Sequence, residues 1–343
     1  MVQLPLSWVT ILAAIPLVDN NRGFVENFCG PGHFCRNCLA TNDAMAHGTF
    51  LSTAFERSTP ENYDAAVVNV CHNALTNYQG VKKKSIFNTL QHYHVCLPGL
   101  PPCLGHDLFE GVVPYDLSLF LGYSFNVKKW FSFQFLNSKI GLFPFRGLEA
   151  ADRPAMVNAL TGKMVGYAVQ VWNLLRFLPF FIDARIDDTG DSIWQLVPLL
   201  RRLVEFVCSP VVSREIIVEM QDVVEEYLEG RVRLFPKEKL RPKHHFLSHY
   251  PFLTMMCGPL IRLWTLRFES KHSYFKNCLR SAKHFKNVTL TMSHKHQLLQ
   301  AMYSAGSLFR MSLINDSGST FHATLYGKQI QRSLASHPHL LES

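Results

Sequence analysis

Hydrophobic residues recur every three to four positions through the middle of the chain, which is the period of an amphipathic α-helix. Two apolar faces fall between about residues 150 and 230, and they hold Met164, Ala168, Trp172 and Leu175, then Ile216, Met220, Val223 and Tyr227. Gly230 follows the second face and is predicted to end its helix, because glycine takes the C′ conformation without strain. The pattern predicts a helical block, divided by a loop at residues 183–191.

Helices are also expected on both sides of this block, over residues 57–75, 99–123, 244–253 and 264–282. Thr59 is a candidate N-cap for the first of them, and Pro60 suits its first turn. The second is expected to begin after a turn and to be interrupted or restarted at Pro114, because proline lacks the backbone N–H that a continuous helix needs.

One β-strand is expected, over the apolar run of residues 7–19, and it ends at Asp19. Few convincing strands follow the first 30 residues, and no internal repeat is present. The most apolar helical stretch, residues 164–182, contains Gln170 and Arg176 and is expected in a protein core, since a membrane span needs about 18 uninterrupted apolar residues. The predicted fold class is therefore mainly α with a small β remnant.

The charge is unevenly distributed. The chain has 343 residues, is 48% hydrophobic, as folded proteins are, and carries a formal charge of +8. The stretch from Glu205 to Glu229 is acid-rich, whereas Glu269 is the only acidic residue between Arg241 and His296. The cations of that segment are Arg241, Lys243, Arg262, Arg267, Lys271, Lys276, Arg280, Lys283, Lys286 and Lys295. An anionic partner, nucleic acid first, fits this distribution.

Glu269 has two interpretations. On a helix it lies one turn from His272 and belongs to a seven-residue repeat with Lys276, so it can be a counter-charge on an ordinary helix face. It can also be a metal-binding carboxylate beside a polyanion, in which case other acids must come from elsewhere in the chain. A di-iron bundle would need a second ExxH motif, and the sequence has none.

Nine cysteines are scattered along the chain, and the odd, irregular set argues for a reducing compartment. Cys35 and Cys38 form a CxxC pair that can chelate one zinc ion, but a structural site needs four ligands. Cys103 and His106 form a CxxH pair able to supply the other two. Competing ligands are Cys29, His33, His47, Cys71 and His72. The alternative is that the CxxC cysteines are simply two semi-buried residues in a loop.

Three histidines, His244, His245 and His249, lie in one short segment, and the last two have helical i, i+4 spacing. Such a pair can bind a metal, but without a nearby carboxylate we expect it to be packed or to face phosphate. The sequence contains no GxSxG, Walker A or GxGxxG motif, so acyl transfer and nucleotide binding have no local support.

Six stretches in order, "VDNNRGFVENF…FCRNCLAT", "KKKSIFNTLQHY", "PPCLGHDLFEGVVPYDL", "RPKHHFLSHYP", "CGPLIRLWTLRFESKHSYFK" and "HKHQLLQAMY", resemble transposases of the CACTA (En/Spm) type, in the form widespread in fish and invertebrate genomes. The resemblance spans roughly residues 10–305. It implies a partial RNase H-like domain that is interrupted by a large α-helical insertion.

The resemblance also implies site residues. Glu269 and Asp19 match two members of a DDE acid triad that would hold Mg²⁺ ions, and Cys103 and His106 match the family's C/DxxH signature. The family's first Asp belongs to a strand upstream of the region that corresponds to Met1. The chain is therefore expected to be N-terminally truncated and inactive in DNA cleavage by itself.

Four segments are expected: 1–125, a partial core with a Cys/His-rich knuckle; 126–240, the helical insertion; 241–310, a basic segment closing the core; and 311–343, a C-terminal tail. The predicted function is that of a nuclear, transposase-derived protein that binds duplex DNA through its phosphates, with contacts from Arg267, Lys271, Lys276, Arg280, Lys283 and Lys286. Two alternatives stay open, a helical scaffold without a nucleic-acid role and a competent transposase in a longer isoform.

Overall fold

The described part of the chain is built mainly from helices, which confirms the mainly α prediction. The computed structural model describes residues 23–26, 28, 30, 32–101, 103–158, 164, 166–283 and 286–305. Within these residues, extended segments pair only as isolated β-bridges. The expected strand at residues 7–19, with Asp19, lies outside the described residues. The chain divides into two compact units, Met1–Thr265 and Leu266–Ser343.

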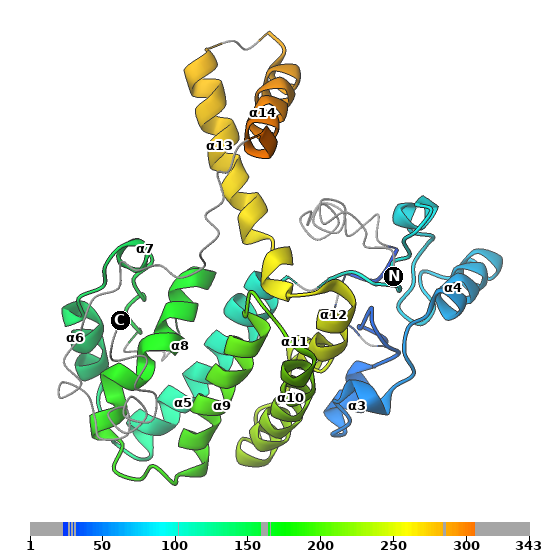
Figure 1. Ribbon diagram of the computed structural model, residues 1–343. Helices are drawn as coiled ribbons and strands as arrows, with labels where there is room; N and C mark the ends of the chain where they lie inside the picture. Colours follow the sequence, from blue (N-terminus) through cyan, green and yellow to red (C-terminus); the bar gives the residue numbers. More distant parts are fainter. Residues whose placement is uncertain are drawn as a thin grey trace. The chain divides into compact units, whose positions relative to one another are not determined.

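The first part of the larger unit carries short helices joined by irregular segments (Figure 1). Its elements are α3 (Asn42–Ala46), η2 (Ser52–Ala54), α4 (Pro60–His72) and η3 (Ile86–Thr89). Helix α4 begins as predicted: the Thr59 hydroxyl accepts a hydrogen bond from the N–H of Asn62, and Pro60 is in the first turn. The buried Tyr63 of α4 lies in a hydrophobic cluster with Phe24, Val81, Tyr93, Val95 and Leu100.

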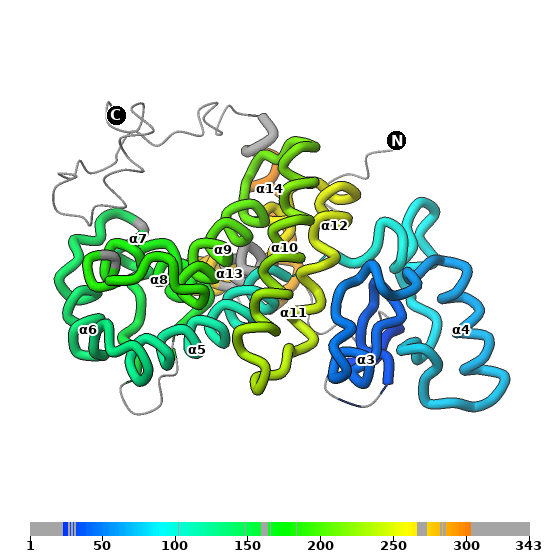
Figure 2. Tube along the Cα trace, turned by 90° about the horizontal axis from the view of Figure 1, so that it is seen from below, coloured from blue at the N-terminus to red at the C-terminus, as the bar shows by residue number. Residues whose placement is uncertain are grey.

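The rest of the larger unit is a group of longer helices. They are η4 (Gly105–Val112), α5 (Val113–Asn126), α6 (Phe133–Leu142), α7 (Leu148–Ala151), α8 (Ala168–Ile182), η5 (Asp183–Arg185), α9 (Ser192–Val207) and α10 (Arg214–Leu234). Helices α8 and α9 pack on α5, and α10 packs on α9 (Figures 1 and 2). The element η4 is a π-helix that leads into α5, so the change of helix type at Val113 occurs where Pro114 predicted an interruption.

Two helix boundaries differ from the prediction. Met164 lies before α8, which begins at Ala168. Gly230 does not end α10, which continues to Leu234. A Cβ atom on Gly230 would lie 2.9 Å from Cδ2 of Leu196 in α9, so glycine at this position allows two helices to approach closely. Its role is packing between helices rather than capping.

The larger unit ends with α11 (Pro242–Leu247), α12 (Tyr250–Cys257) and η6 (Leu260–Leu263). Helix α11 packs on η4, and α12 packs on α10. The smaller unit contains α13 (Leu266–Ala282) and α14 (Val288–Ala305), which contact each other through Tyr274 and His296. Within the described residues, no helix combines the length and apolar character that a membrane span requires.

Candidate metal centre

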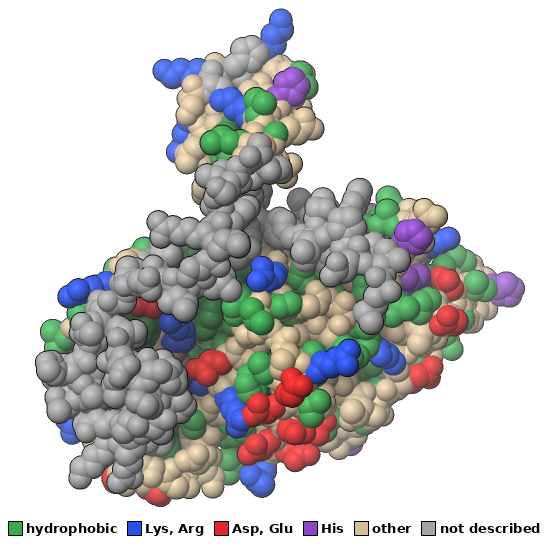
Figure 3. All heavy atoms as spheres, viewed as in Figure 1, with side chains coloured by type: hydrophobic (Ala, Val, Ile, Leu, Met, Phe, Trp, Pro, Cys, Tyr) green, Lys and Arg blue, Asp and Glu red, His purple; other side chains and the backbone are tan. Residues whose placement is uncertain are grey.

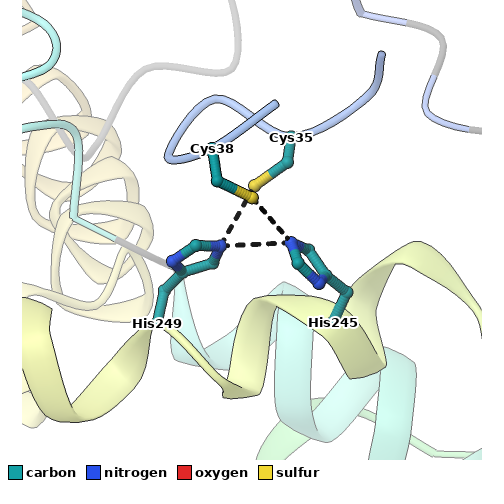
Figure 4. Close-up of side chains that lie close together, drawn as sticks. All are labelled: Cys35, Cys38, His245 and His249. Atoms are coloured by element: carbon teal, nitrogen blue, oxygen red, sulfur yellow. Dashed lines mark hydrogen bonds between the residues drawn. The ribbon is translucent and has the colours of Figure 1, made fainter. Parts of the chain in front are cut away.

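The CxxC motif lies in a tight turn near the start of the larger unit. An antiparallel bridge between His33 and Thr41 brackets the turn, and the N–H of Phe34 donates to the carbonyl of Ala40. The N–H of Asn37 donates to Sγ of Cys35 at 3.4 Å. These backbone contacts direct both thiols to the same side of the turn (Figure 4).

The two facing histidines come from the α11–α12 segment. His245 lies on α11, and His249 lies just before α12 with a near-helical backbone (φ −92°, ψ −14°). The segment therefore keeps the i, i+4 geometry that places both imidazoles on one side, although two separate helices are assigned to it. Ser248, between them, accepts a hydrogen bond from the N–H of Ser52 at 3.0 Å, which ties this segment to the N-terminal part.

The four side chains converge on one point (Figure 4). Sγ of Cys35 lies 3.3 Å from Nε2 of His249, Sγ of Cys38 lies 3.2 Å from Nε2 of His245, and the two Nε2 atoms are 3.1 Å apart. All four candidate ligand atoms lie within 4.8 Å of one another. A tetrahedral zinc ion, with Zn–S of about 2.3 Å and Zn–N of about 2.0–2.1 Å, separates neighbouring ligand atoms by about 3.3–3.8 Å. Small outward shifts would reach that geometry.

Apolar and aromatic residues enclose the cluster. All four ligands are buried, with His245 fully inaccessible. The rings of Phe34 and Phe55 meet the imidazole of His245 edge-on at 5.4 and 5.7 Å. Nδ1 of His245 donates to the carbonyl of Phe50 at 2.7 Å, which leaves the Nε2 lone pair directed at the thiols.

The two thiols are electrostatically unequal. Burial opposes the charge of Cys35, but hydrogen bonds from Cys38 and the histidines, together with the nearby His249, hold its pKa well below the usual thiol range. The hydrogen bond to Cys35, burial and the Cys35 charge raise the pKa of Cys38. Two thiolates at this distance need a cation between them, and a divalent metal ion supplies that charge. The cluster can therefore bind a metal ion such as zinc.

A buried polar network fixes the helix that carries His245. Asp116 of α5 accepts a hydrogen bond from Nε of Arg231 at 2.9 Å and lies 3.1 Å from Nε2 of His244; the Tyr227 hydroxyl donates to the same carboxylate. Arg231 and His244 are almost wholly inaccessible, and the side chain of Asp116 is 5% exposed. The network connects α5, α10 and α11, and it positions the residue next to the ligand His245.

The partner of the CxxC pair differs from the one predicted. We expected Cys103 and His106 to complete the site, but the structure brings His245 and His249 to the thiols. Sγ of Cys103 instead lies 2.7 Å from the hydroxyl of Thr265, beside His106. The competing candidates His33, His47, Cys71 and His72 are also outside the group of four, and Cys29 lies outside the described residues.

The other predicted site residues fall into two groups. The backbone of α13 is described, but the side chains of Arg267, Glu269 and Lys271 are not, and Asp19 lies outside the described residues. The arrangement of the two acids therefore stays a prediction. The other predicted DNA contacts, Lys276, Arg280, Lys283 and Lys286, are all exposed.

Comparison with known proteins gives no further assignment. No protein-family model matches the chain, and no curated protein matches it.

Proposed function

We propose that the larger unit is held together by one structural zinc ion, bound by Cys35, Cys38, His245 and His249. The observation that carries this proposal is the convergence of two thiols and two Nε2 atoms within 4.8 Å in a buried place. Two sulfur and two nitrogen donors suit zinc, and four protein ligands leave no open position for a substrate. The ion would join the N-terminal turn to the α11–α12 segment.

Metal content tests this proposal. The purified chain should contain one zinc ion per molecule by elemental analysis, and Cys38→Ser or His249→Ala should lower that content strongly. Cobalt substitution should give the visible absorption of a tetrahedral thiolate site in the parent chain and not in these two variants. Cys71→Ser, which changes an exposed cysteine of α4, is the matched control and should retain the metal. A metal-free parent chain that folds normally would rule out the structural zinc.

DNA binding is the second proposed function, and a feature of the smaller unit favours it. Lys276, Arg280, Lys283 and Lys286 are exposed on α13 and the turn that follows it. No acidic residue occurs from Ser270 to Asn315, so these charges have no acid close in sequence. Lys and Arg side chains are visible on the face of this unit in Figure 3. Such a surface attracts a polyanion.

The choice of duplex DNA over other polyanions rests on the resemblance to CACTA-type transposases. With that ancestry we propose a nuclear protein that retains phosphate contacts. Contact with the DNA phosphate backbone requires only the Lys and Arg side chains and does not require Asp19 or Glu269. Mg²⁺ binding and strand transfer would require both acids, so they belong to the part of the resemblance that the described residues do not reach.

Salt dependence tests the DNA proposal. Four phosphate contacts predict that the logarithm of affinity falls with the logarithm of salt concentration at a slope of about −3.6. Changing Lys276, Arg280 and Lys283 to Gln should flatten the slope by about 2.7. The control changes Arg233, Lys237 and Lys239 to Gln, which removes the same charge from exposed positions of the larger unit.

The scaffold alternative predicts a different result. A chain whose basic face is merely solvated would show no binding to short duplexes at low salt, and both triple variants would behave like the parent. Equal weakening in both variants would indicate attraction by net charge alone, without a specific surface.

A further inference from the structure

A second cluster of reactive side chains lies where η4 begins. Sγ of Cys103 is 2.9 Å from Nδ1 of His106 and 2.7 Å from the hydroxyl of Thr265. On the other side of the imidazole, Nε2 of His106 lies 3.7 Å from a carboxylate oxygen of Glu110. The order thiol, imidazole, carboxylate is the arrangement that activates a cysteine nucleophile, with the acid orienting the base.

The local fold places these groups together. Cys103 immediately precedes Leu104 and η4, which continues into α5 (Figure 1), so its sulfur lies at the positive end of a long helical run. His106 and Glu110 are one turn apart on η4. Lys243 of α11 donates to the carbonyl of His106 at 2.7 Å and fixes this turn.

The surroundings stabilise a negative sulfur. The backbone N–H groups of His106 and Thr265, as well as their side chains, can donate to a thiolate at Cys103. Burial opposes the charge, but these hydrogen bonds prevail and lower the pKa of Cys103.

The site is partly exposed. Cys103 is partly exposed, and the side chains of His106 and Glu110 are 43% and 44% exposed. By contrast, the thiols of Cys35 and Cys38 are buried in the candidate metal centre. A small reagent can therefore reach Cys103 while those two thiols stay covered.

We propose that Cys103 is a nucleophilic thiol, activated by His106 and Glu110, and that small soft electrophiles modify it. The thiol proton moves to Nδ1 of His106. With iodoacetamide as the probe, the sulfur attacks the carbon that bears iodine, an S–C bond forms, the C–I bond breaks and iodide leaves. The proton on His106 then passes to water.

The experiment measures iodoacetamide alkylation of each cysteine by peptide mass spectrometry. Cys257 is the internal control. It is partly exposed, as Cys103 is, and burial raises its pKa to about 11. At about pH 6.5 an ordinary thiol is about 1% ionised. The larger thiolate fraction of Cys103, partly offset by its lower intrinsic nucleophilicity, predicts that Cys103 reacts at least about fivefold to tenfold faster than Cys257. A Cys103 rate no greater than that of Cys257 would overturn the proposal.

Two further measurements separate activation from simple exposure. His106→Gln should slow Cys103 about fivefold and leave Cys71 and Cys257 unchanged; an unchanged Cys103 rate in a folded variant counts against activation. In the unmodified chain the Cys103 rate should fall less steeply than that of Cys71 between about pH 8 and 6, below the usual thiol range. Equal pH dependences of the Cys103 and Cys71 rates would overturn the proposal, and this test does not depend on the folding of His106→Gln.

A metal-bound alternative gives a different outcome. Because Cys103 and His106 also form a chelating CxxH pair, the alkylation is repeated with added zinc. A Cys103 rate that zinc leaves unchanged supports the nucleophile. Protection of Cys103 by stoichiometric zinc would show that this pair binds metal, and the proposal would be wrong.

Discussion

Removing the proposed zinc ion should weaken the larger unit by an amount that the chain connectivity sets. Cys38 and His245 are 207 residues apart in sequence, so a metal bridge between them closes a very long loop. In the chain-entropy model, a crosslink that closes a loop of that length lowers the conformational entropy of the unfolded chain, which is equivalent to about 5 kcal/mol of free energy at about 25 °C. The bridge therefore stabilises the folded state by up to about this amount, less any strain in the site.

The perturbation is Cys38→Ser, which removes one ligand and keeps a similar volume. We expect the midpoint of thermal unfolding to fall by up to roughly 10–20 °C, at about 2–4 °C per kcal/mol for a large domain. A chelator should lower the parent midpoint to a similar value and leave the variant unchanged. Differential scanning calorimetry, with and without chelator, measures both effects.

The controls decide whether the loss comes from metal or from packing. The turn of the CxxC motif also packs through Phe34, Ala40 and Met45, and this apolar contact survives loss of the ion. Cys71→Ser changes neither a ligand nor this apolar contact, so the variant should unfold like the parent and respond to chelator in the same way. A parent chain whose midpoint a chelator does not move would refute the reasoning, because the crosslink would then contribute nothing.

Asp116→Asn should cost about 3–5 kcal/mol in the free energy of unfolding, measured by urea denaturation, because it leaves the buried charge of Arg231 without its carboxylate. Burial acts to raise the pKa of Asp116, but His244, Arg231 and Tyr227 together lower it. A lowered pKa means that the carboxylate's contribution is complete above the unfolded value of about 3.9 and is lost as pH falls through the folded value. Stability should thus decline more steeply below about pH 4 in the parent than in Asp116→Asn, and equal slopes would contradict this assignment. Thr59→Ala should destabilise by about 0.5–2 kcal/mol, because the first turn of α4 loses its cap; a change near zero would show that the cap contributes little.

The sequence determined the local elements well, because helix formation depends on near neighbours. The hydroxyl of Thr59 and the ring of Pro60 act within one turn, so the start of α4 could be predicted without knowing its surroundings. The apolar face of α10 could be predicted for the same reason, and Met220, Val223 and Tyr227 are buried. The predicted end of that helix was wrong, because Gly230 serves the close packing of α10 against Leu196 of α9 and does not cap α10.

The sequence also identified each half of the candidate metal centre as a pair able to chelate a metal ion. Two cysteines separated by two residues can direct their sulfurs to one ion, and two histidines one helical turn apart can direct their imidazoles to another point. Both geometries follow from the local backbone. The histidine pair was nevertheless expected to pack or face phosphate, because no carboxylate lies nearby in sequence.

Only the tertiary structure decided which halves meet. By spacing alone, the CxxH pair at Cys103 and His106 is as able to chelate a metal ion as the pair at His245 and His249. Spacing therefore cannot decide which of the two pairs meets the CxxC cysteines. The same holds for Thr265, which reaches Cys103 across 162 residues of chain. Such contacts depend on how helices and hydrophobic clusters pack throughout the unit, a sum over many residues that local spacing does not contain.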